Sequence, residues 1–388
     1  MKLTVDRSEL WRGISTVLDA VPSKPAQPVL SNLLLDAAAG GEVTIGATDL
    51  DLSMSTRIVA QVDQPGRVAV PARTLAEISR EWPESQLNVS VEDSRLVVSG
   101  SLGPDKGKGR YSLATAPAEE FPEMPESIDG VTVEFSEAGI GDGQLLRSMI
   151  DKTSFAVSRD ETRPVLNGVL WRLAAEHMVM VATDGSRLAE FKQRWDGAAI
   201  DGLGDGTEVI LPPKVCAQVS KLLEASPELK KVIVGASQVL FEFSDTRLLS
   251  RLIEGPYVDY EQVVPRENDK SLTISVEELL PAVKRVSILS SSYTHQVRMS
   301  LTDHLVELNA SSQEIGGEAR EQIPVEYSGE ALDLAYNGQY LIEILRKMGA
   351  GNAVFDLRDS VTAVIVRPGV QAEGEELYYL LMPMRPSS

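Results

Sequence analysis

Residues 28–34 read Pro-Val-Leu-Ser-Asn-Leu-Leu, and residues 164–170 read Pro-Val-Leu-Asn-Gly-Val-Leu. Both stretches lead from a proline into an apolar, strand-like run, and both follow a segment whose apolar residues have helical spacing. Similar segments in the same order are the signature of an internal repeat, which decides the architecture of the whole chain. The two stretches therefore predict a chain built from copies of one structural unit.

Three copies can be traced outward from these stretches, offset by about 125–140 residues. Each copy opens with a short strand and a helix-like stretch, at residues 3–21, 131–150 and 272–286, where apolar residues recur three and four apart. A short strand then leads into a second helix, and strand hairpins close the copy. The pattern predicts six helices, at residues 7–20, 72–82, 143–152, 214–224, 276–287 and 338–349.

Two of the first helices carry start signals. Asp6 with Glu9, and Ser275 with Glu278, have the spacing of a side-chain capping pair. Pro281 would interrupt a helix interior, so we expect it within the first turn of its helix.

The length of 388 residues exceeds what one hydrophobic core supports, which is about 250–300 residues. We therefore predict three similar domains, residues 1–125, 126–262 and 263–388. Each would have two helices packed on antiparallel sheet, which makes the fold class α+β. Three copies suggest a curved array that closes through self-association.

The net charge of −20 argues by itself against nucleic-acid binding, because phosphate attracts Lys and Arg. The charge is unevenly distributed, however. The six predicted helices together carry +3, so the rest of the chain carries −23. A surface made of these helices would be mildly positive. The alternative is that these cations are simply solvated helix surface.

Composition excludes several other functions. Cys216 is the only cysteine, so the sequence has no disulfide framework and no cysteine zinc site. His177, His295 and His304 form no metal-binding motif, and no nucleophile–base pair stands out. We therefore expect no catalytic residues, metal or cofactor. No apolar run approaches the ~20 residues that span a membrane, and the N-terminus does not have the pattern of a signal peptide. These features favour a cytoplasmic protein.

Four segments, taken together over the repeat, resemble one family closely: the β subunit of bacterial DNA polymerase III, the sliding clamp. They are Val-Ala-Val-Pro-Ala-Arg at 68–73, Asp-Glu-Thr-Arg-Pro-Val-Leu-Asn-Gly at 160–168, Ala-Thr-Asp-Gly-Ser-Arg-Leu-Ala at 182–189 and Met-Pro-Met-Arg at 382–385. The resemblance covers nearly the whole chain. It implies a non-catalytic processivity factor, without 3′–5′ exonuclease activity, that encircles duplex DNA and tethers the replicative polymerase.

The resemblance also implies a DNA-clamp fold in which a head-to-tail homodimer closes a six-domain ring. Helices would line the hole and sheets would lie outside. Contacts between protomers would involve Tyr111 and Leu113 of the first domain and Ile288 and Leu289 of the third. Ordinary core positions remain an alternative for these four residues.

Family clamps recruit partners through short linear motifs that dock between the second and third domains. The matching positions here are Leu166, Thr183, Gly185, Ser186, Arg187, Leu188, Val258, Val263, Asn337, Tyr340, Val361, Ala363, Leu381, Met382, Pro383, Met384 and Arg385. Aliphatic and Met side chains suit an adaptable apolar pocket, and Arg187, Asn337 and Arg385 could bind polar groups of the peptide. Val258 stands where many clamps have Pro, and Ala363 replaces a common Ser.

Lys24, Arg73, Arg159, Arg163 and Lys214 match basic positions that face DNA in relatives. The partners implied are sequence-independent double-stranded DNA, the polymerase III catalytic subunit, the clamp loader, other polymerases, ligase and mismatch-repair proteins, at the replisome on the nucleoid and with no membrane. Two alternatives stay open from the sequence. One is an acidic peptide-binding scaffold that never encloses DNA, and the other is an enzyme with an unusual site.

Overall fold

The computed structural model describes residues 1–103, 106–135, 143–194, 206–225, 228–327 and 329–385. The chain divides into two compact units, residues 1–144 with 217–252 and residues 145–216 with 253–388. Two of the three boundaries fall inside helices of the second copy, α3 (Gly143–Thr153) and α4 (Pro213–Ala225), and the third follows its last strand. The second copy of the repeat is therefore shared between the units, and the three-domain division by sequence remains a prediction.

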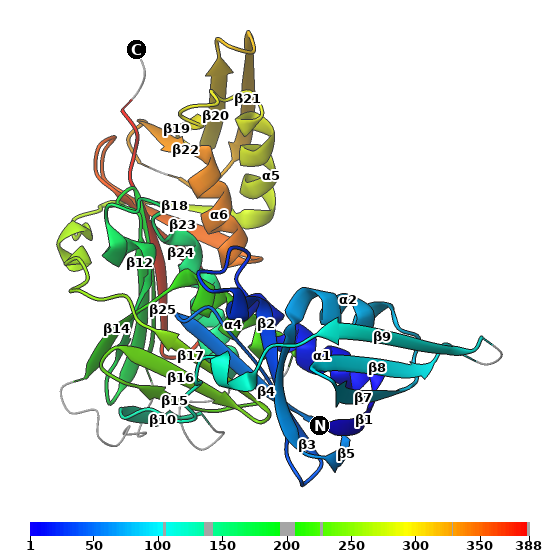
Figure 1. Ribbon diagram of the computed structural model, residues 1–388. Coiled ribbons are helices and arrows are strands. Elements are labelled where there is room, and N and C mark those ends of the chain that lie inside the picture. The colour runs from blue at the N-terminus through cyan, green and yellow to red at the C-terminus, as the bar shows by residue number, and fades with distance from the viewer. Residues whose placement is uncertain (104–105, 136–142, 195–205, 226–227, 328, 386–388) are drawn as a thin grey trace. The chain divides into compact units, whose positions relative to one another are not determined.

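The first unit contains two antiparallel sheets (Figure 1). The five-stranded sheet has the order β5 (Gln61–Gln64), β1 (Lys2–Asp6), β7 (Gln86–Glu92), β8 (Arg95–Ser101) and β9 (Lys108–Ala114). The eight-stranded sheet has the order β10 (Val131–Glu134), β15 (Leu229–Val234), β16 (Gln238–Phe243), β17 (Thr246–Arg251), β4 (Leu52–Val59), β3 (Glu42–Thr48), β2 (Asn32–Ala37) and β6 (Gly66–Pro71).

The second unit repeats this plan. Its eight-stranded sheet has the order β14 (Thr207–Leu211), β11 (Val169–Leu173), β12 (His177–Thr183), β13 (Arg187–Arg194), β25 (Glu375–Leu381), β24 (Val364–Pro368), β23 (Asn352–Leu357) and β18 (Lys270–Ser275). Its four-stranded sheet has the order β21 (Gly317–Pro324), β20 (Leu305–Ser312), β19 (Gln296–Thr302) and β22 (Leu332–Asn337).

Consecutive copies are joined by strand pairing. The last strand of the second copy, β17, pairs with β4 of the first copy (Figure 1). The last strand of the third copy, β25, pairs in the same antiparallel way with β13 of the second. Two strands that correspond to these partners have no such pairing and end their sheets. β9 is the last strand of the first copy, as β17 and β25 are of theirs, and β21 is the third copy's counterpart of β4 and β13.

All six predicted helices are present, with ends shifted by a few residues at most: α1 (Arg7–Val17), α2 (Ala72–Glu81), α3, α4, α5 (Val276–Ser287) and α6 (Gly338–Met348). The two Pro-Val-Leu stretches form short 3-10 helices, η2 (Pro28–Ser31) and η5 (Pro164–Asn167), each followed by a buried strand. Within the first unit α1 packs against α2 and β4, and within the second α5 packs against α6, β20 and β21. The α+β prediction is confirmed.

Two predictions about the helix starts are wrong in detail. Asp6 and Ser275 occupy N-cap positions, but neither side chain accepts a hydrogen bond from its helix. The Ser275 hydroxyl instead donates to the Glu277 carboxylate at 2.9 Å, because the carboxylate two residues on competes for it. Pro281 is the sixth residue of α5 and lies in its second turn, where it cannot donate to the carbonyl four residues earlier.

The β13–β25 pairing that joins the second and third copies holds an unusual carboxylate. Glu190 of β13 lies opposite Tyr378 of β25, whose hydroxyl donates to Glu190 Oε2 at 2.6 Å. Burial raises the pKa of Glu190 above its ordinary value, and outweighs the hydrogen bonds from Tyr378 and Tyr260, which lower it. The ionised side chain is therefore held in this sheet at a cost in stability.

We expect Glu190→Gln to stabilise the second unit at neutral pH. Folding raises the Glu190 pKa, so its contribution to stability is complete below the ordinary carboxyl pKa and is lost as pH rises through the folded-state value. The difference in free energy of unfolding between variant and wild type should therefore grow from pH 4.5 to pH 7.5 in denaturant titrations. The exposed Glu176→Gln is the control. An equal difference at both pH values would contradict this account.

Candidate functional site

The turn after β12 is built by its own polar side chains. Thr183 Oγ1 accepts a hydrogen bond from the Gly185 amide at 3.1 Å. Asp184 Oδ1 accepts from the amides of Ser186 and Arg187 at 2.8 and 3.0 Å. Gly185 has a φ of +91°, a conformation that glycine adopts at little cost. The sequence Thr-Asp-Gly-Ser-Arg thus encodes a rigid turn.

The first copy contains the same turn. Thr48 Oγ1 accepts from the amide of Leu50, and Asp49 Oδ1 accepts from the amides of Asp51 and Leu52. The turn is therefore a property of the repeat, and by itself it points to no function. After the shared Thr-Asp pair the two turns differ in sequence, and the last residue is Arg187 in the second copy where the first copy has Leu52.

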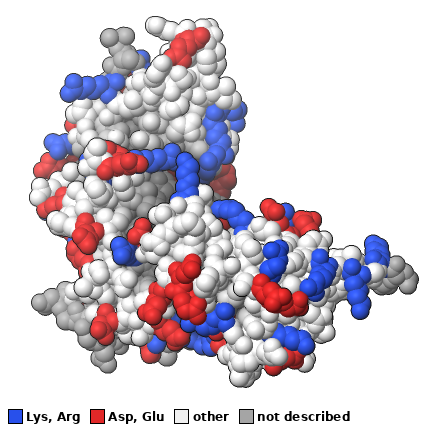
Figure 2. Space-filling view, viewed as in Figure 1, with Lys and Arg blue, Asp and Glu red and all other residues white. Residues whose placement is uncertain are grey.

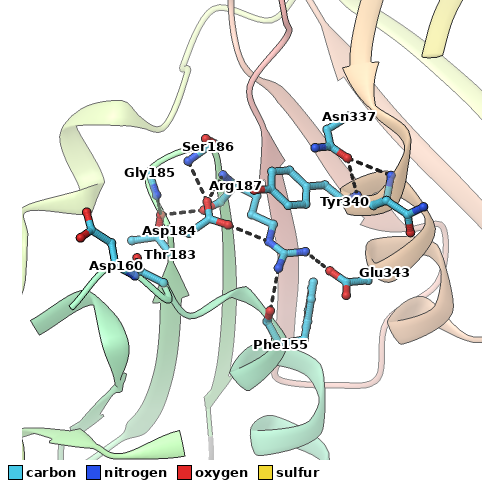
Figure 3. A network of polar contacts seen from close by, with 12 residues as sticks. Phe155, Asp160, Thr183, Asp184, Gly185, Ser186, Arg187, Asn337, Tyr340 and Glu343 are labelled. Atoms are coloured by element: carbon cyan, nitrogen blue, oxygen red, sulfur yellow. Dashed lines mark hydrogen bonds and ion pairs between the residues drawn. The ribbon is translucent and has the colours of Figure 1, made fainter. Parts of the chain in front are cut away.

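Arg187 is the centre of a polar network in the second unit (Figure 3). Its side chain is only 8% exposed. Its Nε donates to Asp184 Oδ2 at 3.1 Å, its Nη2 donates to the Phe155 carbonyl at 2.8 Å, and its Nη1 pairs with Glu343 of α6. The guanidinium lies 4.2 Å from the ring centroid of Tyr340, a cation–π distance. These contacts fix the β12–β13 turn against helix α6.

The N-terminus of α6 is fixed by Asn337. Its side-chain oxygen accepts from the amides of Gln339 and Tyr340 at 2.9 and 3.3 Å, which is the bonding of a helix N-cap. Burial, with the nearby Asp184 carboxylate, raises the pKa of Tyr340. Two predicted site residues, Asn337 and Tyr340, are thus held beside the turn that carries Thr183 and Arg187.

The segment after β25 runs between these two elements. The Met382 amide donates to the Ser186 carbonyl at 2.9 Å, and the Met384 amide donates to the Ala335 carbonyl at 2.7 Å. Met382 is exposed, while Pro383 and Met384 are half-buried and Arg385 is exposed. Backbone bonds therefore hold two methionines along the surface formed by the β12–β13 turn and β22.

The remaining predicted site residues fall into two groups. Exposed aliphatic side chains lie on two loops: Val258, Val263 and Val361. The other group is buried: Leu166, Leu188, Ala363 and Leu381. Val361 sits on a turn in which Asp359 Oδ1 accepts the amides of Val361 and Thr362, bonds that lower the pKa of Asp359. The structure brings the turn, α6 and the Met segment together, and places the three valines on two other connections of the same unit, Val258 and Val263 between β17 and β18 and Val361 between β23 and β24.

The five residues predicted to contact DNA are all exposed. Lys24 and Arg73 belong to the first unit, and Arg159, Arg163 and Lys214 belong to the second. Arg163 is also tied to the turn described above, because its Nη2 donates to the Asp184 carbonyl at 3.5 Å and its Nε pairs with Asp160 at 2.8 Å. Their common role on DNA remains a prediction.

The four residues predicted at the protomer contact lie beside the two sheet ends left by the repeat. Tyr111 and Leu113 belong to β9, where Tyr111 is exposed and packs edge-on against Trp82. Ile288 follows α5 and is exposed. Leu289 lies close to Gly317, the first residue of β21.

Sequence reasoning missed Phe155, Asp184 and Glu343 as members of the site. Glu343 follows Tyr340 by three residues on a predicted helix, so both had to lie on one face. Asp184 was recognised only as part of a turn. Phe155 carries no sequence signal, because its backbone carbonyl rather than its side chain accepts the bond from Arg187.

Three successive parts of the chain each match a family model. Residues 1–125, 142–259 and 261–385 match the N-terminal, central and C-terminal domains of the DNA polymerase III beta subunit. This chain belongs to the DNA polymerase III β-subunit family. Relatives named "Beta sliding clamp" include those of Caulobacter vibrioides, 35% identical over 99% of this chain and 100% of the relative, and Escherichia coli, 30% identical with the same coverage.

Solved structures agree over the full length of both chains. A DNA polymerase sliding clamp from Pseudomonas aeruginosa, crystallised with ligand, superposes with a TM-score of 0.88 at 30% identity. A Caulobacter crescentus beta sliding clamp with polyethylene glycol at a proposed beta-motif tethering region gives 0.86 at 33% identity. The family prediction is confirmed. Its members are non-catalytic processivity factors that work with DNA and polymerase, which supports neither the acidic scaffold nor the enzyme alternative.

No helix within the described parts of the chain is long and apolar enough to cross a membrane.

We expect Arg187→Gln to lower the free energy of unfolding by about 3 kcal/mol, because it leaves the Asp184 carboxylate, whose side chain is only 14% exposed, without its cation. Arg194→Gln removes an arginine whose ion pair with Glu376 is mostly exposed, and should cost about 1 kcal/mol or less. Denaturant titrations of both variants would test this. Similar losses for the two variants would show that the Arg187 network does not hold the site together.

Proposed function

We propose that two copies of this chain close a ring in which β9 of one protomer pairs with β21 of the other. The observation that carries this proposal is the repeat of strand junctions. The last strand of a copy pairs with a β4-type strand at both junctions inside the chain. Among the strands of these two types, only β9 and β21 lack a junction partner within the chain. In a head-to-tail dimer, β9 of each protomer would pair with β21 of the other, which completes both junctions.

The side chains at these two strands support the pairing. Exposed Lys108 on β9 and exposed Glu318 on β21 carry opposite charges and have no ion pair among the described residues. Arg110 of β9 is paired with Glu92, and Glu321 of β21 with Arg285. Tyr111 and Leu113 on one side, and Ile288 and Leu289 on the other, supply apolar surface. Complementary charge around an apolar centre is the composition expected of a specific protein interface.

In this ring DNA is retained by enclosure. Lys24, Arg73, Arg159, Arg163 and Lys214 would make exchangeable phosphate contacts, which carry no sequence information. Individually such contacts are weak, with nonspecific dissociation constants of about 10⁻⁴–10⁻⁶ M at physiological salt. A closed ring needs no more, because it can leave an uninterrupted duplex only by opening.

Partners bind through the surface formed by the β12–β13 turn, the start of α6, the Met382–Arg385 segment and the exposed Val258, Val263 and Val361. Methionine side chains adapt to different apolar partners. The donors of Arg187 are engaged with protein acceptors, so its role here is to orient this surface. The partners would be the polymerase III catalytic subunit and the clamp loader, together with other polymerases, ligase and mismatch-repair proteins, at the replisome on the nucleoid.

The ring predicts that Leu113→Lys with Ile288→Lys dissociates the dimer, because both charges would be desolvated at the interface. The dimer dissociation constant, from analytical ultracentrifugation, should rise roughly 30-fold or more. Val59→Lys changes an exposed valine at the end of β4 and should leave the dimer intact. A dimer unaffected by the double substitution would refute the β9–β21 junction.

The peptide surface predicts that Met382→Glu with Met384→Glu weakens binding of a fluorescent peptide carrying the clamp-binding motif of the polymerase by at least about tenfold, since charge would replace apolar contact. Fluorescence anisotropy measures the affinity, and sedimentation should show an unchanged dimer. Val370→Glu, on an exposed turn of the same unit, is the control. Unchanged peptide affinity would place the partner site elsewhere.

A further inference from the structure

The second helix of each copy carries a cation at the same place. The three helices begin at Ala72, Pro213 and Gly338, and the ninth residue is Arg80 in α2, Lys221 in α4 and Arg346 in α6. The fourth residue of each helix is a buried anchor, Leu75, Cys216 and Leu341. The cation follows the anchor by five positions in all three helices, so the repeat presents the cation on equivalent, solvent-exposed parts of the helices.

The three cations differ in their partners. Arg80 pairs with the neighbouring Glu81 at 3.0 Å. Lys221 pairs at 2.6 Å with Asp19, which follows α1 of the first copy. Arg346 has no ion pair among the residues that the structure describes, because Glu343, one turn earlier on α6, is engaged with Arg187. The same position is thus neutralised in two copies and available in the third.

The surface charge reflects this difference. In Figure 2, acidic and basic side chains lie next to each other over α2, whereas basic side chains lie over the α5–α6 pair. The last turns of these two helices carry Arg346 and Lys347 in α6 and Lys284 and Arg285 in α5. Of these, Arg285 pairs with Glu321 of β21 at 2.6 Å. Lys284, Arg346 and Lys347 thus have no ion pair among the residues that the structure describes, unlike Arg80 and Lys221.

We propose that the ninth-position cations track the DNA phosphates inside the ring, and that Glu81 and Asp19 compete with phosphate for Arg80 and Lys221. This rests on the proposed enclosure of DNA. Exposed ion pairs are worth about 0–1 kcal/mol, so a phosphate can displace the carboxylate and the carboxylate can recover its cation. Two copies then hold DNA weakly while Arg346 holds it more firmly, which limits friction during sliding.

Opposite effects of two substitutions in one ion pair test the competition. Lys221→Gln should weaken binding of a short fluorescent duplex to the dimer, whereas Asp19→Asn should strengthen it about two- to fivefold by freeing Lys221. Arg346→Gln should reduce the slope of log affinity against log salt by about 1–2, because each ring holds two copies and each phosphate contact contributes about 0.9. Anisotropy titrations from low to physiological salt give both quantities.

The Arg67–Asp36 pair is a close control. Its side chains are 57% and 41% exposed, against 57% and 45% for Lys221–Asp19, but it joins two strands of a sheet. Arg67→Gln and Asp36→Asn should leave duplex affinity unchanged. If Asp36→Asn strengthens duplex binding as much as Asp19→Asn, the gain comes from the lower net negative charge of the protein and not from release of Lys221, and the inference is wrong.

Two further outcomes distinguish failure of the proposed competition from failure of the proposed enclosure of DNA. If the ion pair serves only to join the first and second copies, Lys221→Gln and Asp19→Asn should lower the unfolding midpoint alike and change duplex affinity in the same direction or not at all. That result would overturn the competition and leave the ring intact. If the wild-type dimer shows no salt-dependent duplex binding, the enclosure of DNA fails as well.

Discussion

An unpaired strand edge is the constraint on which this structure depends. Backbone amides and carbonyls at the edge of a sheet bond only to water unless another strand pairs with them, and an exposed edge invites another chain to add to it. The repeat meets this need by letting the last strand of each copy complete the sheet of the copy before it. Two eight-stranded sheets result, each built from half of one copy and half of the next. The same arrangement leaves β9 of the first copy and β21 of the third without such a partner, and the proposed association with a second copy rests on these two strands.

The partner surface is a modification of the same repeated framework. The Thr-Asp turn occurs in the first and second copies with the same hydrogen bonds, so it arose as a structural element of the repeat. Replacing a leucine by Arg187 at its end converts that turn into a connection between copies, because a buried guanidinium must find several acceptors. Asp184, the Phe155 carbonyl and Glu343 provide them. The third copy is thereby fixed against the second at the place where the partner peptide is proposed to bind.

Much of this could be predicted from the sequence. The six helices were found because their apolar residues recur three and four apart, and Leu75, Val219 and Leu341 are buried as that spacing requires. The hydrogen bonding at the starts of α1 and α5 could not be predicted from the sequence. Whether the side chain of Asp6 or Ser275 bonds to a helix amide or to another side chain depends on which groups lie nearby, as the Ser275–Glu277 bond shows. The pairing of β17 with β4, 190 residues away, leaves no periodic signal in either strand. The Arg187 network could not be foreseen because one acceptor is a backbone carbonyl and another comes from a different copy.

The central claim is that DNA is held by enclosure and not by affinity, and it can be tested with one plasmid. Protein loaded by the clamp loader on a nicked circular plasmid should stay bound through gel filtration at 0.5 M salt. Cutting the plasmid at a single site should release it, because the ring can then slide off the ends. Loss from the circle at this salt, or retention after cutting, would contradict the account, since either result would mean that contacts with DNA, and not topology, determine how long the protein stays bound.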